Sequence, residues 1–141
     1  MQIIVRGLEA VRAKLATLEA GLVRGALQVL GQTAKDLVQD GFRNERAPDG
    51  TGWQPLSQVT IAKKNSSRIL VDNGLMRNSW NYRVSETDVT IGTNDPKAPF
   101  HQYGTRRIPI REMLPSDSLP TFWAQEFDQA LDAYIALRAR S

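Results

Sequence analysis

Side chains that could perform acid–base or nucleophilic chemistry are few in this sequence. The single histidine is His101, and together with Ser79 and Asp72 it would complete a Ser-His-Asp set. A chain of 141 residues offers such a set by chance. His101 has no cysteine or acidic cluster beside it, which makes it a poor metal ligand. We therefore expect a structural hydrogen bond near a helix end for His101, and a hydrolase or nuclease that uses His101 with Asp72 is kept as an alternative.

Two further patterns are compatible with chemistry but are also typical of ordinary surface. Asp36 and Asp40 are one helical turn apart and can pair as carboxylates, although their place away from the apolar stripe favours a solvated face. The run Gly-Thr-Gly-Trp at 50–53 lacks the spacing and the lysine of a phosphate-binding loop. Because there is no cysteine, disulfides, thiolate metal sites and a cysteine nucleophile are excluded. The sequence predicts no catalytic residue, no cofactor and no metal, and we expect that the protein is not an enzyme.

Charge is distributed unevenly along the chain, whose formal net charge is +3. Residues 61–111 carry nine basic and four acidic side chains, whereas residues 112–141 carry two basic and five acidic ones. Segregated charge can steer unlike faces of neighbouring subunits toward each other, and an ordinary solvated surface is the alternative. The basic segment, with Trp80 and Tyr82, also permits a DNA-binding module that holds phosphate and stacks bases.

The elements that must position these side chains are organised around residues 69–93. Asp72, Asn73 and Gly74 predict a turn, because Asn and Gly tolerate positive φ. Trp80, Tyr82 and Val84 then alternate with polar residues, and the alternation resumes at Val89 and Ile91. Period two predicts a β-hairpin with one apolar face, so Trp80 and Tyr82 are better explained as core than as a stacking platform.

Helices are predicted on both sides of this hairpin. Apolar residues recur at three and four positions over 8–19 and over 22–43, which indicates one short and one long amphipathic helix. Residues 97–103 predict a short helix that Gly104 ends, and Pro120 predicts the first position of a final helix to about residue 138. With an edge strand at 2–5, we expect a single domain, 1–141, of the α+β class, with helices packed on a small, mostly antiparallel sheet.

Two segments without apolar periodicity are expected to be loops. Residues 45–68 are rich in glycine, proline and polar side chains and predict a partly flexible loop, in which Trp53 is either a core plug or an interface anchor. Residues 105–118 predict an extended arm or an edge strand, because Pro109 cannot donate within a sheet. No apolar run approaches the roughly 18 residues that span a bilayer, and the N-terminus is too short for a signal peptide. We expect a soluble protein that is intracellular at synthesis.

Five short motifs follow one another through the middle of the chain. They are Gly52 to Leu56 with Thr60, Lys63 and Lys64; Ile69 to Ser79; Val89 to Asn94; Ala98 to Gly104 with its Phe100-His101-Gln102; and Ile108-Pro109-Ile110-Arg111. In this order and spacing, the motifs resemble the virion morphogenesis, or tail-completion, proteins of tailed bacteriophages. The resemblance covers about residues 45–115, with similar helices on each side.

The resemblance implies a structural protein rather than an enzyme. It implies a homo-oligomeric ring, expected to be a hexamer, at the head–tail junction of the virion, with other phage neck and tail proteins as partners. The protein would occupy the host cytoplasm during assembly, would have no membrane partner, and would contact DNA in the channel non-specifically at most. We hypothesise partner contacts for a set of basic, aromatic and aliphatic residues: Trp53, Lys63, Lys64, Arg68, Arg106, Arg107, Ile108, Ile110 and Arg111. Structural turns are expected at Asp72, Asn73, Gly74 and Gly104.

Overall fold

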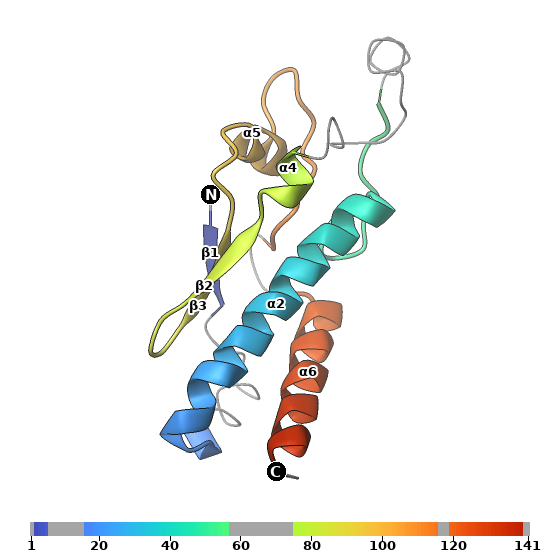
Figure 1. Ribbon diagram of the computed structural model, residues 1–141. Helices are drawn as coiled ribbons and strands as arrows, with labels where there is room; N and C mark the ends of the chain where they lie inside the picture. Colours follow the sequence, from blue (N-terminus) through green and yellow to red (C-terminus); the bar gives the residue numbers. More distant parts are fainter. Residues whose placement is uncertain (1, 6–15, 57–74, 116–118, 140–141) are drawn as a thin grey trace.

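Helices and a small antiparallel sheet form the computed structural model, which describes residues 2–5, 16–56, 75–115 and 119–139 (Figure 1). The described elements, in chain order, are β1 (Gln2–Val5), α2 (Ala20–Asn44), α4 (Leu75–Asn78), β2 (Asn81–Val84), β3 (Val89–Gly92), α5 (Ala98–Tyr103) and α6 (Thr121–Ala139). The predicted α+β class is confirmed, with one long N-terminal helix, a C-terminal helix and an antiparallel sheet.

The sheet has the order β1-β3-β2, and both strand pairs are antiparallel. Tyr82 pairs with Ile91 and Val84 pairs with Val89, so the apolar residues of the hairpin share one face. Val89 and Ile91 are fully buried beside Trp80, whereas Arg83 is exposed. The predicted hairpin and its apolar face are confirmed, and Trp80 is a core residue.

The long helix α2 is the element on which the rest of the fold packs. Its 25 residues span about 37 Å. Its apolar stripe, which includes Leu27, Leu30, Val38 and Phe42, is buried. In Figure 1, α2 runs between the sheet and α6, and it contacts both. The helix begins at Ala20, two residues before the predicted start at residue 22.

The C-terminal helix α6 begins at Thr121, one residue after Pro120, which the sequence predicts as its first position. Trp123 and Phe127 bury their rings edge to face at 6.2 Å, and Leu131 continues the buried stripe. Leu137, close to the end of α6, is exposed, so the buried stripe does not continue to it. The Tyr134 hydroxyl donates to the carbonyl of Leu22, so the contact between the two helices has reached the first turn of α2 by Tyr134.

Several predicted features lie outside the described residues. They are most of the expected helix at 8–19, Lys63, Lys64 and Arg68, and the turn at Asp72, Asn73 and Gly74. Of the predicted arm, residues 105–115 are described and belong to no strand, which favours the arm over an edge strand. Among the helices that the structure describes, none combines the length and apolarity that a membrane span requires.

Candidate functional site

The base of the arm is tied to the loop that follows α2. The Trp53 indole N–H donates to the carbonyl of Glu112 at 3.0 Å, across 59 positions of sequence. In the other direction, Arg111 donates from Nε (3.0 Å) and Nη2 (2.8 Å) to the carbonyl of Gln54. Two of the motifs noted in the sequence therefore meet in space and hold each other.

Both side chains of this clamp are buried, at 6% exposure each for Trp53 and Arg111. Trp53 packs edge to face on Phe42 at 5.5 Å, so it is the core plug of the two alternatives. Burial lowers the pKa of Arg111 from its ordinary value, and the nearby Glu45 carboxylate partly offsets this. Trp53 and Arg111 therefore support the arm from inside. Both were hypothesised as partner contacts, but as buried residues they leave little surface for a partner.

A second clamp holds the returning segment of the arm to α5. The side-chain amide of Gln102 donates to the carbonyl of Leu114 at 2.8 Å, and its oxygen accepts from the N–H groups of Met113 (2.8 Å) and Leu114 (3.1 Å). Gly104 ends α5 with φ of 75°, which confirms the predicted turn, and a Cβ there would lie 2.7 Å from Ile110 Cγ1. The arm is thus fixed at its base.

The tip of the arm presents cationic and apolar side chains to solvent. The Thr105 N–H donates to the carbonyl of Ile108 at 2.8 Å and closes the turn that carries Arg106 and Arg107, which are both exposed. Ile110 is 61% exposed and Ile108 is half-buried. On the neighbouring α5, Tyr103 is 65% exposed and Phe100 lies one turn before it. We call the exposed set the arm patch: Phe100, Tyr103, Arg106, Arg107 and Ile110.

An open groove of about 650 Å³ lies between the C-terminal half of α2 and the N-terminal half of α6. We call it the α2/α6 groove, and it is lined by Thr33, Asp36, Leu37, Gln39, Asp40, Arg43, Phe122, Glu126, Gln129 and Ala130. Phe122 forms part of its wall and is 47% exposed, although it is a large apolar side chain. No residue of the arm patch lines this groove.

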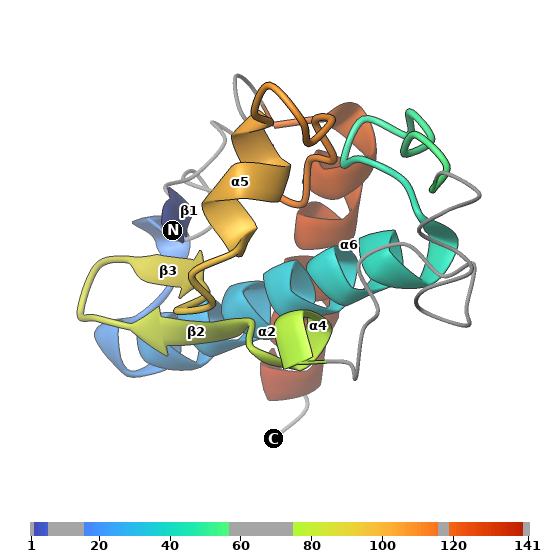
Figure 2. The same ribbon diagram turned by 90° about the horizontal axis from the view of Figure 1, so that it is seen from above.

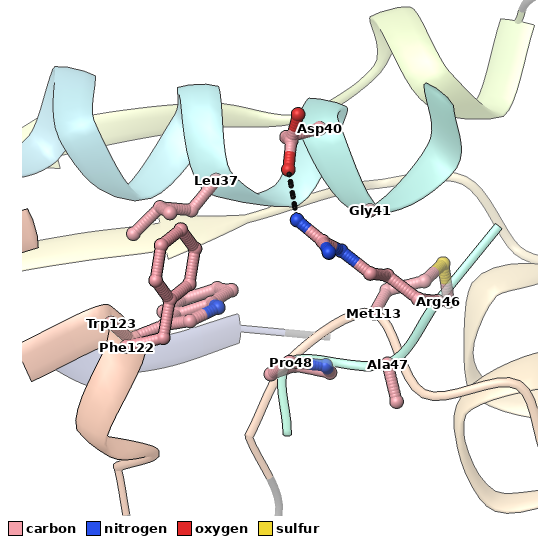
Figure 3. A pocket seen from close by; sticks show the side chains of 9 residues that line it. All are labelled: Leu37, Asp40, Gly41, Arg46, Ala47, Pro48, Met113, Phe122 and Trp123. Atoms are coloured by element: carbon pink, nitrogen blue, oxygen red, sulfur yellow. Dashed lines mark hydrogen bonds and ion pairs between the residues drawn. The ribbon is translucent and has the colours of Figure 1, made fainter. Parts of the chain in front are cut away.

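A small cavity of about 20 Å³, with room for one water molecule, shares Leu37, Asp40 and Phe122 with the groove and marks what we call its narrow end. Figure 3 shows Arg46 reaching across this end to Asp40, with Phe122 and Leu37 on one side and Pro48 on the other. Arg46 Nη2 lies 3.1 Å from the Asp40 carboxylate, and its guanidinium lies 5.9 Å from the centre of the Phe122 ring. This ion pair closes the narrow end.

The open part of the groove carries negative charge. Asp36, Asp40 and Glu126 line it against one guanidinium, that of Arg43. Arg46 neutralises Asp40 from the narrow end, and Arg43 lies farther from Asp40, at 4.0 Å, with a side chain that is 75% exposed. The carboxylates that set the charge of the open part are therefore those of Asp36 and Glu126.

Of the residues with possible catalytic chemistry, Ser79 has a structural role for its side chain, and His101 is held through its backbone. The Ser79 hydroxyl hydrogen-bonds to the Thr93 hydroxyl and donates to the carbonyl of Met76 at 2.7 Å. The carbonyl of His101 accepts from the Arg111 N–H at 2.7 Å, and Asp72 lies outside the described residues. Within the described ranges, no group of three or more His, Cys, Asp or Glu side chains could hold a metal ion.

The lowered pKa of the Asp49 carboxyl also has a local cause. The backbone N–H of Thr51 donates to Asp49 at 2.9 Å, and this hydrogen bond lowers the pKa of the Asp49 carboxyl below its ordinary value. Asp49 is exposed, and the bond shapes the turn that leads from α2 to Trp53. The shift therefore belongs to a loop turn and not to a reactive centre.

The sequence did not predict the α2/α6 groove or the second clamp of the arm, which Gln102 forms. Phe122 and Glu126 precede or interrupt the apolar stripe of α6, and only their position opposite Asp36 and Asp40 makes them one surface. Gln102 lies inside a motif, but its three partners are 11 and 12 positions away. A sequence signal for the groove was Phe122, a large apolar residue that lies outside the apolar stripe of α6.

A comparison with known protein families identifies the family to which the chain belongs. A model of the phage virion morphogenesis family matches residues 4–121 of the 141, from strand β1 to the first residue of α6. No curated protein and no solved structure matches the chain significantly. The family is one of structural proteins, which gives the chain a structural role in virion assembly. Because the match covers well over half of its residues, the chain belongs to the phage virion morphogenesis family.

Proposed function

We propose that this protein acts at the head–tail junction, where it completes the tail or joins it to the head without catalysing a reaction. The observation that carries the proposal is the arm, which is clamped at its base by Arg111 and Gln102 and exposes Arg106, Arg107 and Ile110 at its tip. A preformed projection loses little conformational entropy when it binds a neighbour. Such a projection is useful to a structural subunit whose neighbours complete it.

The proposed assembly is a homo-oligomeric ring, expected to be a hexamer, around the channel through which DNA passes. A ring of identical subunits needs two different and complementary patches on each subunit. The arm patch and the α2/α6 groove are two such patches, one cationic and one anionic. Further partners would be other neck and tail proteins, which would meet the ring on its two outer faces.

The deciding experiment is electron microscopy of lysates from a phage or prophage that lacks this gene, with a complemented control. The junction role predicts DNA-filled heads and separate tails that are of finished length or overlong. Complementation with the wild-type gene should restore joined particles. Normal joined particles without the gene would contradict the proposal.

DNA binding is the second candidate, and one observation favours it. Arg106 and Arg107 are exposed close to the exposed rings of Phe100 and Tyr103, a combination that can hold phosphate and stack bases. Base stacking on Trp80 and Tyr82 of the hairpin, as first considered, is wrong, since Trp80 is buried and Tyr82 packs against Gly31 of α2. A steep loss of DNA affinity with rising salt at micromolar protein would favour this candidate. Affinity that does not respond to salt, or none, would remove it.

A further inference from the structure

We propose that the α2/α6 groove of one copy receives the arm patch of the next copy in a head-to-tail contact. The inference rests on the proposed ring and names the surfaces that would build it. In this contact Arg106 and Arg107 lie opposite Asp36 and Glu126, and Ile110 or Tyr103 packs on Phe122.

Charge complementarity is the first argument. The described acidic side chains of the groove that Arg46 does not match are Asp36, which accepts a hydrogen bond from Gln32, and Glu126. The lining also contains the exposed cation Arg43, so the open part keeps an excess of negative charge, and the arm tip carries two adjacent guanidinium groups. Guanidinium groups can hold carboxylates through paired hydrogen bonds, which fixes orientation as well as attraction. This arrangement favours a contact between an arm patch and a groove. Two arm patches, or two grooves, would place like charges opposite each other and repel.

The apolar composition of the two surfaces is the second argument. Ile110 and Tyr103 are each more than 60% exposed, and Phe122 is 47% exposed at the edge of the groove. Exposed apolar side chains surrounded by charge are typical of docking surfaces. The two surfaces therefore match in both properties, with an aromatic or aliphatic centre and a charged rim of opposite sign.

The positions of the two surfaces decide between a self-contact and a contact with another copy. Figure 1 shows α5 and the arm at one end of the molecule, and Figure 2 shows α5 displaced sideways from α2. No arm residue from 104 to 112 lines the groove of its own chain. The arm patch that fills the groove consequently comes from a second copy of the chain. Because the two patches differ and lie in different places, the contact is heterologous and can close into a ring.

Charge reversal on each side gives a test that only a heterologous contact passes. The arm variant combines Arg106→Glu with Arg107→Glu, and the groove variant combines Asp36→Lys with Glu126→Lys. Each variant alone should lose self-association about tenfold or more, since like charges then meet. An equal mixture should recover it, because each arm then meets a groove of opposite charge.

The readouts are sedimentation of the purified full chain and complementation of a phage that lacks the gene. Neither variant should complement alone, and co-expression of both should restore plaques even where the free protein is monomeric. A control variant with Arg83→Glu and Lys97→Glu has the same net charge as the arm variant but alters neither surface, and it should behave as wild type. Circular dichroism and thermal unfolding check that all variants fold.

The outcomes separate this inference from the proposed function. Single variants that associate or complement like wild type, or a mixture of folded variants that recovers neither, would overturn the arm-in-groove contact. Joined particles in lysates without the gene would overturn the junction role, whatever the variants do. Loss of activity in the arm variant that the groove variant cannot restore, with loss of DNA binding, would assign the arm to DNA instead.

Because the chain has no cysteine, introduced thiols can map the same contact without background. Ile110→Cys and Gln129→Cys place one thiol on each surface, and a flexible bis-maleimide should link them. The contact predicts dimers from a mixture of the two single variants and a ladder of oligomers from the double variant. A ladder from Ile110→Cys paired with Thr87→Cys at the hairpin tip, in place of Gln129→Cys, would contradict it.

Discussion

At the scale of single residues, the structure separates side chains that hold the arm from those that face solvent. Arg111 and Gln102 both belong to conspicuous motifs, yet their hydrogen bonds are directed inward to backbone groups of other segments. Arg106, Arg107 and Ile110, within a few positions of them, are exposed. Side chains that clamp the arm and side chains that face solvent thus alternate along one short stretch, and substitutions of the two kinds should have different effects.

Gln102→Leu should be strongly destabilising. The change keeps the approximate volume but removes the partners of three backbone groups at Met113 and Leu114. Each unsatisfied buried group costs about 1 to 3 kcal/mol, so we expect the three together to lower the free energy of unfolding by about 3 kcal/mol or more. Urea unfolding followed by tryptophan fluorescence measures it.

Gln125→Leu is the matched control, because Gln125 is exposed on α6. Its effect should stay within about 0.5 kcal/mol, as for most surface substitutions. If both variants unfolded at the same urea concentration, the Gln102 clamp would contribute nothing to stability.

At the scale of elements, glycines set how closely α2 approaches its neighbours. A Cβ at Gly31 would lie 2.7 Å from Tyr82 Cγ and 2.8 Å from Val89 Cγ2, so the sheet packs directly on the helix backbone. A Cβ at Gly25 would collide with the Tyr134 hydroxyl of α6. Two glycines six residues apart therefore allow α2 to contact the sheet and α6 closely.

Gly31→Ala should destabilise the protein although alanine is the better helix former. The added methyl group must displace Tyr82 and Val89, and overpacking of this kind costs about 1 to 3 kcal/mol. Gly21→Ala in the same helix meets no atom within 4 Å and should stabilise by up to about 1 kcal/mol. Thermal unfolding of both variants should give shifts of opposite sign, and a rise in Tm for Gly31→Ala would show that the sheet does not pack so closely.

At the scale of the whole molecule, the uneven charge of the sequence becomes two separate surfaces. The cationic arm and the anionic groove lie on different elements. Arg111 ties the arm to the loop that follows α2, and α2 forms one wall of the groove. Attraction between exposed charges acts over a Debye length, which is about 10 Å at about 0.1 M salt. Assembly that depends on these surfaces should respond to ionic strength.

Self-association should weaken as sodium chloride rises from about 0.1 M to about 1 M, where the Debye length falls to about 3 Å. Analytical ultracentrifugation across the salt series measures the change in association constant. The variant Arg106→Gln with Arg107→Gln should bind more weakly and show a smaller dependence on salt. An association constant that stays unchanged or rises with salt would mean that the apolar residues alone drive the contact.

The sequence by itself determined which elements form. Alternation at 80–84 and 89–91 produced the hairpin, the apolar stripe at 22–43 produced α2, and Gly104 ended α5 as expected. These features depend on neighbours within a few residues, where backbone sterics and side-chain period act directly. The order of short motifs also gave the family that the match to residues 4–121 confirms.

Only the tertiary structure decided which of these residues face inward and which surfaces they share. Trp53 and Arg111 were expected at a partner contact, but they bind backbone carbonyls 59 and 57 positions away. The acidic groove joins residues of α2 to residues of α6 that are at least 79 positions later in the chain. Burial and surface charge depend on how distant segments meet, and no local period or composition encodes that meeting.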